Sequence, residues 1–248
     1  SAASDVYKRQ ELRYIIPLLK YKWPNPDDNA SLAHTFQDSV DKYGNQNFIY
    51  FEDQILTYSQ TNEAANILAN RLIKDGVTHS DRVVLFMENR PEYIISILAL
   101  NKIGAIGVLI NTSLTGAPLV HCINSSDSKK CIIGAELAAP LEGVLNEINV
   151  TDKSNIYWVK DGENYSCPSW ASDLDTLLDE SEKQTPKEIG NVTAKDTAFY
   201  IFTSGTTGVP KAALFPNTKI VAASTNITKA GYRMNNEDCL YNLSLIHI

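Results

Sequence analysis

The hydrophobic residues of this chain fall into short runs that alternate with longer stretches of helical periodicity. Each run holds four to six mostly apolar residues, the length of one buried strand. The intervening stretches carry apolar residues at three- and four-residue spacing, as amphipathic helices do. Strands that are apolar on both faces and separated by helices indicate a parallel sheet covered on both sides. The sequence therefore predicts an α/β fold, with strands at residues 83–87, 105–110, 130–133 and 156–159.

Before the first of these strands, the pattern predicts a helix, a hairpin and a second helix. Residues 31–43 repeat apolar positions at four-residue spacing, and residues 47–58 hold two apolar runs around a polar turn. Thr57 and Gln60 have the spacing of a capping box, in which each side chain bonds the other residue's backbone N–H. We therefore expect the second helix to begin there and to end near Asp75.

The remaining elements complete the predicted order. Residues 170–182 read as an acidic amphipathic helix, and Asn217 is a candidate N-cap for the last helix, before a final strand near Cys239. The other predicted helices are residues 91–104, 116–125, 137–148 and 217–231.

The organisation into domains follows from the irregular and polar stretches. Residues 1–30 are predicted to be an irregular N-terminal segment whose first residues are not necessarily native, and residues 180–191 are the best linker candidate because they are polar. We expect residues 31–182 to form a first α/β subdomain. Residues 183–248 would begin a second part of the same domain.

Composition and charge exclude several classes of function. The 248 residues carry a net charge of −7 with no basic stripe, so nucleic acid is not an expected partner. The four cysteines and four histidines lack metal-ligand spacing, which argues against a structural zinc site and a disulfide framework. The neighbours His121 and Cys122 lie in a predicted helix and point in different directions, so we interpret them as packing residues. No apolar stretch reaches the roughly 20 residues of a membrane span, and a span preceding residue 1 stays open.

Residues 198–215 carry the strongest chemical signal. An apolar strand at 199–202 leads into glycines and hydroxyl residues, and Lys211 precedes a second apolar run. Glycines let the backbone approach a ligand closely, and successive N–H groups can form an anion-binding hollow. Hydroxyl donors and one lysine would complete a site suited to binding phosphate. The hydroxyl residues and glycines are Thr203, Ser204, Gly205, Thr206, Thr207 and Gly208.

This loop differs from a Walker A motif. A Walker A loop has four residues between its first glycine and a Gly-Lys-Ser/Thr sequence. Here Gly205 and Gly208 are three apart, and Lys211 is followed by alanine. An ordinary polar hairpin turn would also fit the two flanking strands, but it would not need this density of hydroxyls, glycines and a Pro-Lys pair.

The stretch from Thr203 to Lys211 resembles the phosphate-binding signature of the adenylate-forming (AMP-binding) superfamily, Thr-Ser-Gly-Ser/Thr-Thr-Gly-x-Pro-Lys, at every fixed position. Residues 110–116, Ile-Asn-Thr-Ser-Leu-Thr-Gly, followed by Leu119-Val-His121, are similar to the fatty acid transport protein and very-long-chain acyl-CoA synthetase group. That group typically has Asn and Arg where this chain has Ser113 and Thr115.

The resemblance implies a fold and a function. The fold would be the large N-terminal domain of an adenylate-forming enzyme, incomplete at its C-terminus because the later adenine, ribose and lysine motifs of the family are missing. The activity would be ATP-dependent ligation of a long or very long chain fatty acid to CoA through an acyl-adenylate, with ATP, Mg²⁺ and CoA as cofactors or substrates. The fragment alone is expected to be inactive. Membrane association through segments outside these residues, facing the cytosol, would follow from the subgroup.

The resemblance also implies the site residues. Thr206 and Lys211 would be catalytic, and no metal ligand is assigned. The loop as a whole would hold the pyrophosphate of ATP through Thr203, Ser204, Gly205, Thr206, Thr207, Gly208 and Lys211.

Two alternatives stay open at this point. The chain is also compatible with an adenylating ligase for another carboxylic acid, because the acid-pocket residues of the family lie further along. A fatty-acid uptake or binding protein without ligase activity is the other alternative, and the complete loop argues against it.

Overall fold

A seven-stranded sheet with the order β7-β6-β5-β3-β4-β8-β9 forms the centre of the computed structural model. The structure describes residues 21–150, 152–178, 183–203, 210–226, 228, 232, 234 and 238–241. Every neighbouring pair of strands is parallel except β8 and β9, which are antiparallel. The predicted α/β fold with a mostly parallel sheet is confirmed. The strands are β3 (Arg82–Phe86), β4 (Ile106–Leu109), β5 (Lys130–Gly134), β6 (Ile156–Val159), β7 (Ser172–Asp173), β8 (Thr197–Thr203) and β9 (Lys211–Pro216).

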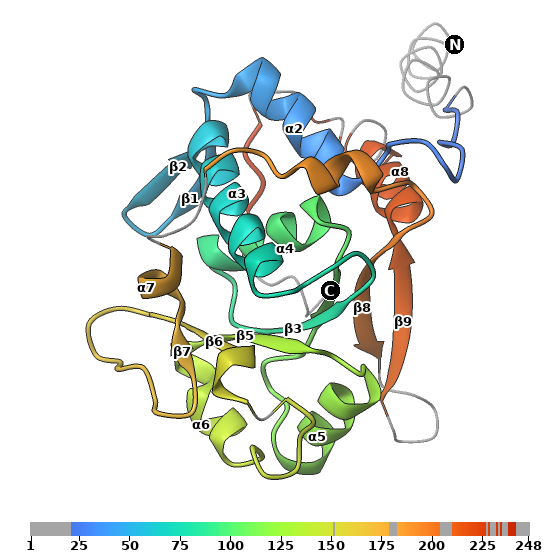
Figure 1. The fold of residues 1–248 in the computed structure, drawn as a ribbon. Coiled ribbons are helices and arrows are strands. Elements are labelled where there is room, and N and C mark those ends of the chain that lie inside the picture. Colours follow the sequence, from blue (N-terminus) through green and yellow to red (C-terminus); the bar gives the residue numbers. More distant parts are fainter. Residues whose placement is uncertain are drawn as a thin grey trace, which may run out of the picture.

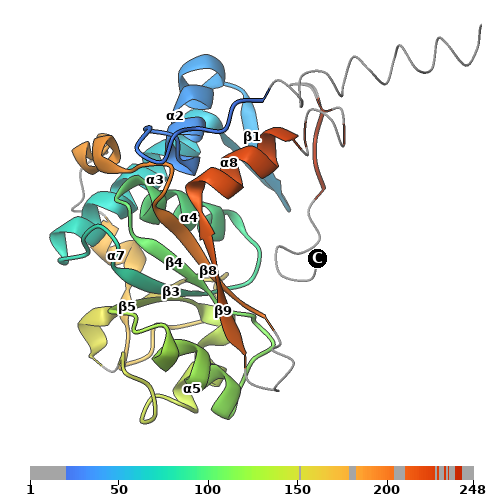
Figure 2. The same ribbon diagram turned by 90° about the vertical axis from the view of Figure 1, so that its right-hand side faces the viewer.

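Helices cover both faces of this sheet, which is why its central strands are mostly apolar on both sides. Val83 and Leu85 of β3 join one hydrophobic core, while Val84 and Phe86 join the core on the opposite face. Figures 1 and 2 show α3 and α4 on the first face and α5 and α6 on the second, with α2 as an outer layer over α3 and α4. These helices are α2 (Leu32–Tyr43), α3 (Tyr58–Lys74), α4 (Pro91–Lys102), α5 (Gly116–Ser125) and α6 (Ala138–Glu142).

The N-terminal elements match the sequence prediction closely. Strands β1 (Asn47–Phe51) and β2 (Gln54–Thr57) form a separate antiparallel hairpin. Thr57 and Gln60 make the predicted capping box, in which both side chains bond the other residue's backbone N–H. Helix α3 then runs to Lys74, and Gly76 follows with a φ of +82°, a left-handed conformation that ends the helix.

The predicted helix at residues 137–148 was wrong in its length. A short 3₁₀ turn (Ala135–Leu137) leads into α6, which already ends at Glu142. After Glu142 the backbone forms turns, in which the N–H groups of Val144 and Glu147 donate to the carbonyl three residues earlier. The Asn124 side chain holds the end of this segment, because its amide donates to the Glu147 carbonyl and its oxygen accepts from the Asn149 N–H. These bonds hold the segment in turns, while its apolar residues still reach the core.

The predicted helix at residues 170–182 was also wrong at its start. Ser172 and Asp173 instead form β7, which pairs with Tyr157 and Trp158 of β6. Helix α7 (Leu174–Leu178) begins only after this strand, where the Asp173 carboxylate accepts a hydrogen bond from the Asp175 N–H. The apolar spacing predicted a helix over this whole range. Instead, Ser172 and Asp173 pair with the edge of β6 and form a strand.

The last predicted elements fall partly outside the described residues. Helix α8 (Asn217–Asn226) confirms a helix after β9, and the rest of its predicted range to residue 231 is only partly described. Residues 238–241 form no strand, so the strand predicted to begin near Cys239 was wrong over those residues. Part of the linker candidate, residues 180–182, lies outside the description, and the remainder includes a 3₁₀ helix (Lys187–Asn191). The subdomain boundary at residues 182 and 183 stays a prediction.

Candidate functional site

The two ends of the predicted phosphate loop lie side by side at the tip of the β8–β9 hairpin. Thr203 is the last residue of β8, Lys211 is the first of β9, and the two are direct partners in the antiparallel ladder. The Thr203 hydroxyl donates a long hydrogen bond of 3.5 Å to the Lys211 carbonyl. Both side chains are exposed to solvent. Of the predicted site residues, the structure therefore places these two, whereas Ser204, Gly205, Thr206, Thr207 and Gly208 lie outside the described residues.

The hairpin tip lies at the edge where ligands bind in open α/β sheets. Strand β8 runs parallel to β4, so Thr203 comes at the carboxyl end of the parallel strands. Crevices outside the carboxyl ends of such strands are the usual ligand sites of this architecture. Figure 2 shows β8 and β9 side by side with α5 near their tip. The two strands predicted to flank the loop are thus confirmed, and the binding role of the loop stays a prediction.

Helix α5 contacts the base of this loop directly. The Nε2 atom of His121 lies 2.9 Å from the carbonyl oxygen of Pro210, the residue before Lys211. A carbonyl oxygen only accepts hydrogen bonds, so Nε2 must be the protonated nitrogen and the donor. The interpretation of His121 as a packing residue therefore missed its contact with the loop. The Leu-x-His pattern of the resemblance was the available signal in the sequence.

Cys122, the neighbour of His121, is a core residue as predicted. Its side chain is fully buried, and burial raises the pKa of its thiol to about 11. A thiol with that pKa remains protonated at neutral pH and is a poor nucleophile. The two side chains therefore form no catalytic dyad.

The opposite end of the hairpin is fixed by Asn217, the first residue of α8. Its side-chain oxygen accepts from the Asn101 side-chain amide at 2.9 Å and from the Leu32 N–H at 3.4 Å. Its own amide donates to the Thr193 carbonyl at 3.1 Å. Asn217 was predicted to cap α8, but its side chain instead joins α8 to α2, α4 and the segment before β8. Long-range partners of this kind leave no mark in a local sequence pattern.

A second polar region lies around Arg90, and sequence reasoning did not find it. The Arg90 side chain is 6% exposed and lies within 3.5 Å of carboxylate oxygens of Glu92 and Glu136 and 3.1 Å from Asp161. It also donates to the Val159 carbonyl. These contacts join the segments that follow β3, β5 and β6, the same sheet edge that carries the hairpin tip.

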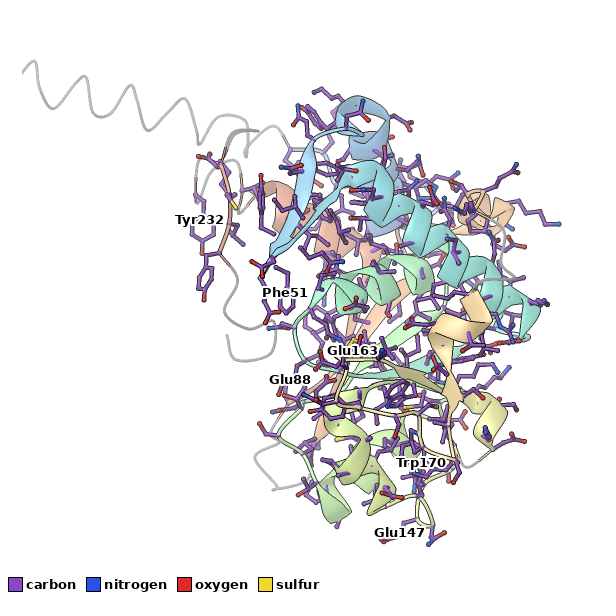
Figure 3. The ribbon with its side chains drawn as sticks, turned by 90° about the vertical axis from the view of Figure 1, so that its left-hand side faces the viewer. Phe51, Glu88, Glu147, Glu163, Trp170 and Tyr232 are labelled. Carbon is purple, nitrogen blue, oxygen red and sulfur yellow. The ribbon has the colours of Figure 1, made fainter. Side chains whose placement is uncertain are left out.

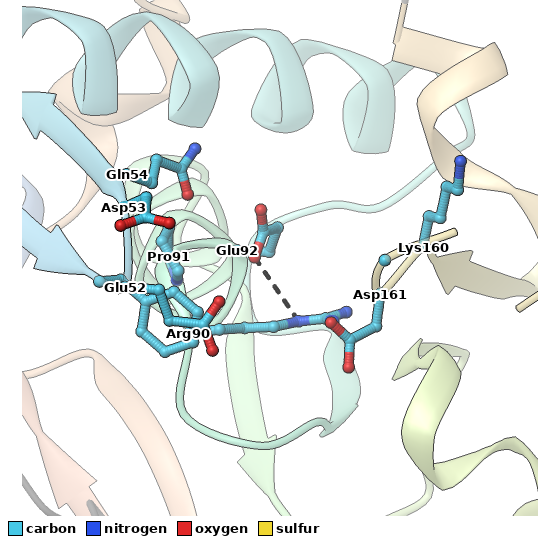
Figure 4. Close-up of a pocket in the computed structure, with 10 residues that line it drawn as sticks. Glu52, Asp53, Gln54, Arg90, Pro91, Glu92, Lys160 and Asp161 are labelled. Atoms are coloured by element: carbon cyan, nitrogen blue, oxygen red, sulfur yellow. Dashed lines mark ion pairs between the residues drawn. The ribbon is translucent and has the colours of Figure 1, made fainter. Parts of the chain in front are cut away.

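A hollow of about 510 Å³ opens beside Arg90, under the turn of the β1–β2 hairpin. Figure 4 shows Glu52 and Asp53 of that turn on one side of the hollow and Asp161 on the other. Phe51, which also lines the hollow, is labelled in Figure 3. Carboxylates outnumber the two basic side chains, Arg90 and Lys160, in this lining. Because Arg90 is already neutralised by its carboxylate partners, the region reads as an ion network that ties loops together.

Neither a metal site nor a membrane span is found in the part of the chain that the structure describes. No group of three or more His, Cys, Asp or Glu side chains among these residues is arranged to hold a metal ion. Within the same residues, no helix combines the length and hydrophobicity required to cross a bilayer.

The family model of the AMP-binding enzymes matches residues 36–248, and the chain belongs to this family. Among curated relatives, the chain is 34% identical over 224 residues to the medium/long-chain-fatty-acid–CoA ligase FadD6 of Mycobacterium tuberculosis, covering 90% of this chain and 35% of that protein. It is 27% identical over 243 residues to long-chain fatty acid transport protein 6 of Mus musculus, covering 97% of this chain and 38% of that protein. The chain thus spans little more than a third of the length of these relatives.

Solved structures agree on the fold. A fatty acyl CoA synthetase of Mycobacterium tuberculosis superposes with a TM-score of 0.63 at 21% identity, covering 83% of this chain and 44% of that one. The anthranilate CoA ligase AuaEII in complex with anthranoyl-AMP gives a TM-score of 0.69 at 19% identity, over 81% of this chain and 36% of that one. At these identities the likeness establishes the fold alone.

Proposed function

We propose that this chain is part of an acyl-CoA synthetase that activates a long or very long chain fatty acid. The observation that carries the proposal is the pairing of Thr203 with Lys211 at the carboxyl edge of the sheet, with the complete signature sequence between them. The family match and the relatives named as fatty-acid CoA ligase and fatty acid transport protein support the choice of substrate class.

The reaction would have two half-steps. The carboxylate of the fatty acid attacks the α-phosphate of ATP, which forms an acyl-adenylate and releases pyrophosphate. The thiol of CoA then attacks the acyl carbon, forms a thioester and releases AMP. A free carboxylate is a poor acyl donor, so the first step supplies the leaving group that the second step needs.

The residues of this chain would act on the departing pyrophosphate. Lys211 supplies a positive charge at the loop base, and Thr206 is proposed to donate a hydrogen bond to the same phosphates. Stabilising charge that develops in the transition state is the main way in which such sites accelerate a reaction. The remaining loop groups would bind the phosphates through hydroxyls and backbone N–H donors, and these are Thr203, Ser204, Gly205, Thr207 and Gly208.

The partners of the proposed reaction are ATP, CoA and a fatty acid. Mg²⁺ is proposed to enter with the ATP phosphates, its usual mode of binding in proteins, and no ligand of this chain is assigned to it. Membrane association on the cytosolic side is proposed from the transport-protein relatives alone. Nucleic acid is not a proposed partner, because the chain is acidic.

The test is fatty-acid-dependent exchange between ATP and labelled pyrophosphate, measured on the full-length protein. A series of saturated acids of increasing length is compared with benzoate and anthranilate. We expect exchange with the long-chain acids. Exchange with the aromatic acids alone would replace the substrate class by another carboxylic acid. Binding of fatty acid without any exchange would favour an uptake or binding protein.

A further inference from the structure

We propose that His121 is a positioning residue for the phosphate-binding loop, acting through the carbonyl group of Pro210. The inference rests on the proposed function for what the loop binds, but its structural part stands on contacts among described residues. His121 lies on α5, and Pro210 is 89 residues further along the chain, at the point where the loop rejoins β9.

The hydrogen bond acts on the peptide unit that leads into Lys211. Because a peptide bond is planar, the carbonyl of Pro210 and the N–H of Lys211 belong to one rigid plane. Pro210 has no N–H, so its carbonyl is the only backbone hydrogen-bonding group that it offers. A donor at 2.9 Å from that oxygen therefore fixes the orientation of the plane from which the Lys211 backbone starts. The direction of the lysine side chain depends on this plane.

Helix α5 is held firmly enough to serve as the reference. Leu119, Cys122 and Ile123 on this helix are at most 1% exposed, and they belong to the core that Tyr200 and Phe202 of β8 also contact. The imidazole of His121 thus comes from an element that shares a hydrophobic core with β8, the strand that leads into the loop. A hydrogen bond made from such an element holds its acceptor better than one made from a loop.

The two ends of β9 are then fixed by different side chains. His121 bonds the residue before the strand, and Asn217 lies directly after it, with bonds to Asn101 and Thr193. Between them, the strand itself is fixed by its ladder with β8. Without the His121 bond, the ladder still ends at the Thr203–Lys211 pair, but the Pro210 carbonyl loses the side-chain donor that orients it.

The experiment uses side chains that place a donor at different points. In His121→Gln the side-chain amide nitrogen comes near the position of imidazole Nε2, whereas in His121→Asn it comes near that of Nδ1. His121→Phe keeps the ring and removes the donor. Asn124→Ala is the control, because Asn124 lies one turn further along α5 and bonds Glu147 and Asn149 instead of the loop.

The first of two measurements is made on the 248-residue chain, and the second is made on the full-length protein. The backbone amide resonance of Lys211 is followed by nitrogen-15 NMR without ligand, and the Kd of MgATP is measured by calorimetry. We expect the Lys211 resonance to move in the Phe and Asn variants and to stay close to wild type in the Gln and Asn124→Ala variants. The Kd should rise roughly threefold to tenfold in the Phe and Asn variants, the effect of one hydrogen bond.

Each other outcome decides the question. An unchanged Lys211 resonance in the Phe variant, or an equal shift in Asn124→Ala, would overturn the positioning role. If the Phe variant does not fold, the Gln and Asn variants decide, since they differ only in where the amide lies. If the full-length wild-type protein binds no MgATP, the proposed function fails, and the Lys211 resonance still decides whether His121 positions the loop base.

Discussion

The side-chain amide of Asn101 donates a hydrogen bond of 2.9 Å to the side-chain oxygen of Asn217, and both residues are at least 98% buried. They lie 116 residues apart in the sequence, on α4 and at the start of α8. Asn101 also accepts from the Ala33 N–H of α2, so one pair of amides joins three helices. The pair fixes where the hairpin leaves the core.

We predict that Asn217→Leu destabilises the chain by about 2–4 kcal/mol. The substitution leaves the buried Asn101 amide and the half-buried Thr193 carbonyl without their partner. A buried group without a partner costs about 1–3 kcal/mol, and a half-buried group costs less. Urea unfolding followed by circular dichroism measures the change. The exposed Asn164 offers a matched control, where Asn164→Leu should change the free energy of unfolding by less than about 0.5 kcal/mol. Equal effects at the two positions would contradict this account.

Lys102 predicts a pH dependence of stability. Its side chain is fully buried, its amine is 3.4 Å from the Gln37 side-chain oxygen, and burial lowers its pKa from 10.5 to about 8. Between these two pH values the unfolded state holds the proton and the folded state does not, so the contribution of this group to stability rises with pH. Below pH 8 both states are protonated, and the folded state carries a buried charge.

The substitution Lys102→Met tests this sign. We expect the variant to be more stable than wild type at pH 7, by up to about 3 kcal/mol, with the difference shrinking as the pH rises toward 10.5. The measurement is the difference in free energy of unfolding between the two proteins at several pH values, in which the titration of all shared groups cancels. A difference that does not vary with pH would show that the charge of Lys102 does not limit stability.

Removing Arg90 should destabilise the fold strongly. In Arg90→Met, the carboxylate of Glu136, only 14% exposed, loses its positive partner, and Val159 loses its donor. Breaking a buried ion pair on one side costs about 3–5 kcal/mol. Glu92→Gln is the control, since Glu92 is 41% exposed and lies 3.5 Å from Arg90, and its loss should cost less than about 1 kcal/mol. The measurement is the melting temperature of each variant. Equal melting temperatures for Arg90→Met and Glu92→Gln would contradict the ion network.

Substitutions in the proposed phosphate loop should slow the first half-reaction. We expect Lys211→Met and Thr206→Val each to reduce the rate of ATP–pyrophosphate exchange about 10²–10³-fold in the full-length protein, while the melting temperature stays within a few degrees. Lys219→Met, which removes an exposed lysine of α8, is the control with no expected effect. Wild-type exchange in both loop variants would remove these residues from the site.

The sequence predicted well whatever depends on local periodicity. The strands at Arg82–Phe86 and Ile156–Val159 and the helix Gly116–Ser125 were predicted within a residue or two, because buried strands and amphipathic helices have their own spacing. The capping box at Thr57 and Gln60 was predicted to the residue, since its two bonds are local.

What the sequence missed depends on contacts between distant segments. Ser172 and Asp173 became a strand because β6 had an open edge, and a helical pattern in their own neighbourhood carried no sign of it. The Asn217 side chain bonds Asn101 and Thr193 instead of capping its own helix. His121 was assigned to packing, because the local hydrophobic periodicity gives no sign of a bond to a residue 89 positions away.

The antiparallel partner of β8 changes the electrostatics of the loop that joins it to β9. In βα units a helix begins directly after the binding loop, and the positive end of its macrodipole faces the phosphates. Here Lys211 begins a strand, and strands contribute little net dipole. If the loop binds phosphate as proposed, no helix follows it directly, and Lys211 is the positive side chain that the chain places at its base. Nucleotide binding should accordingly weaken with ionic strength more steeply than in a loop with a helix behind it.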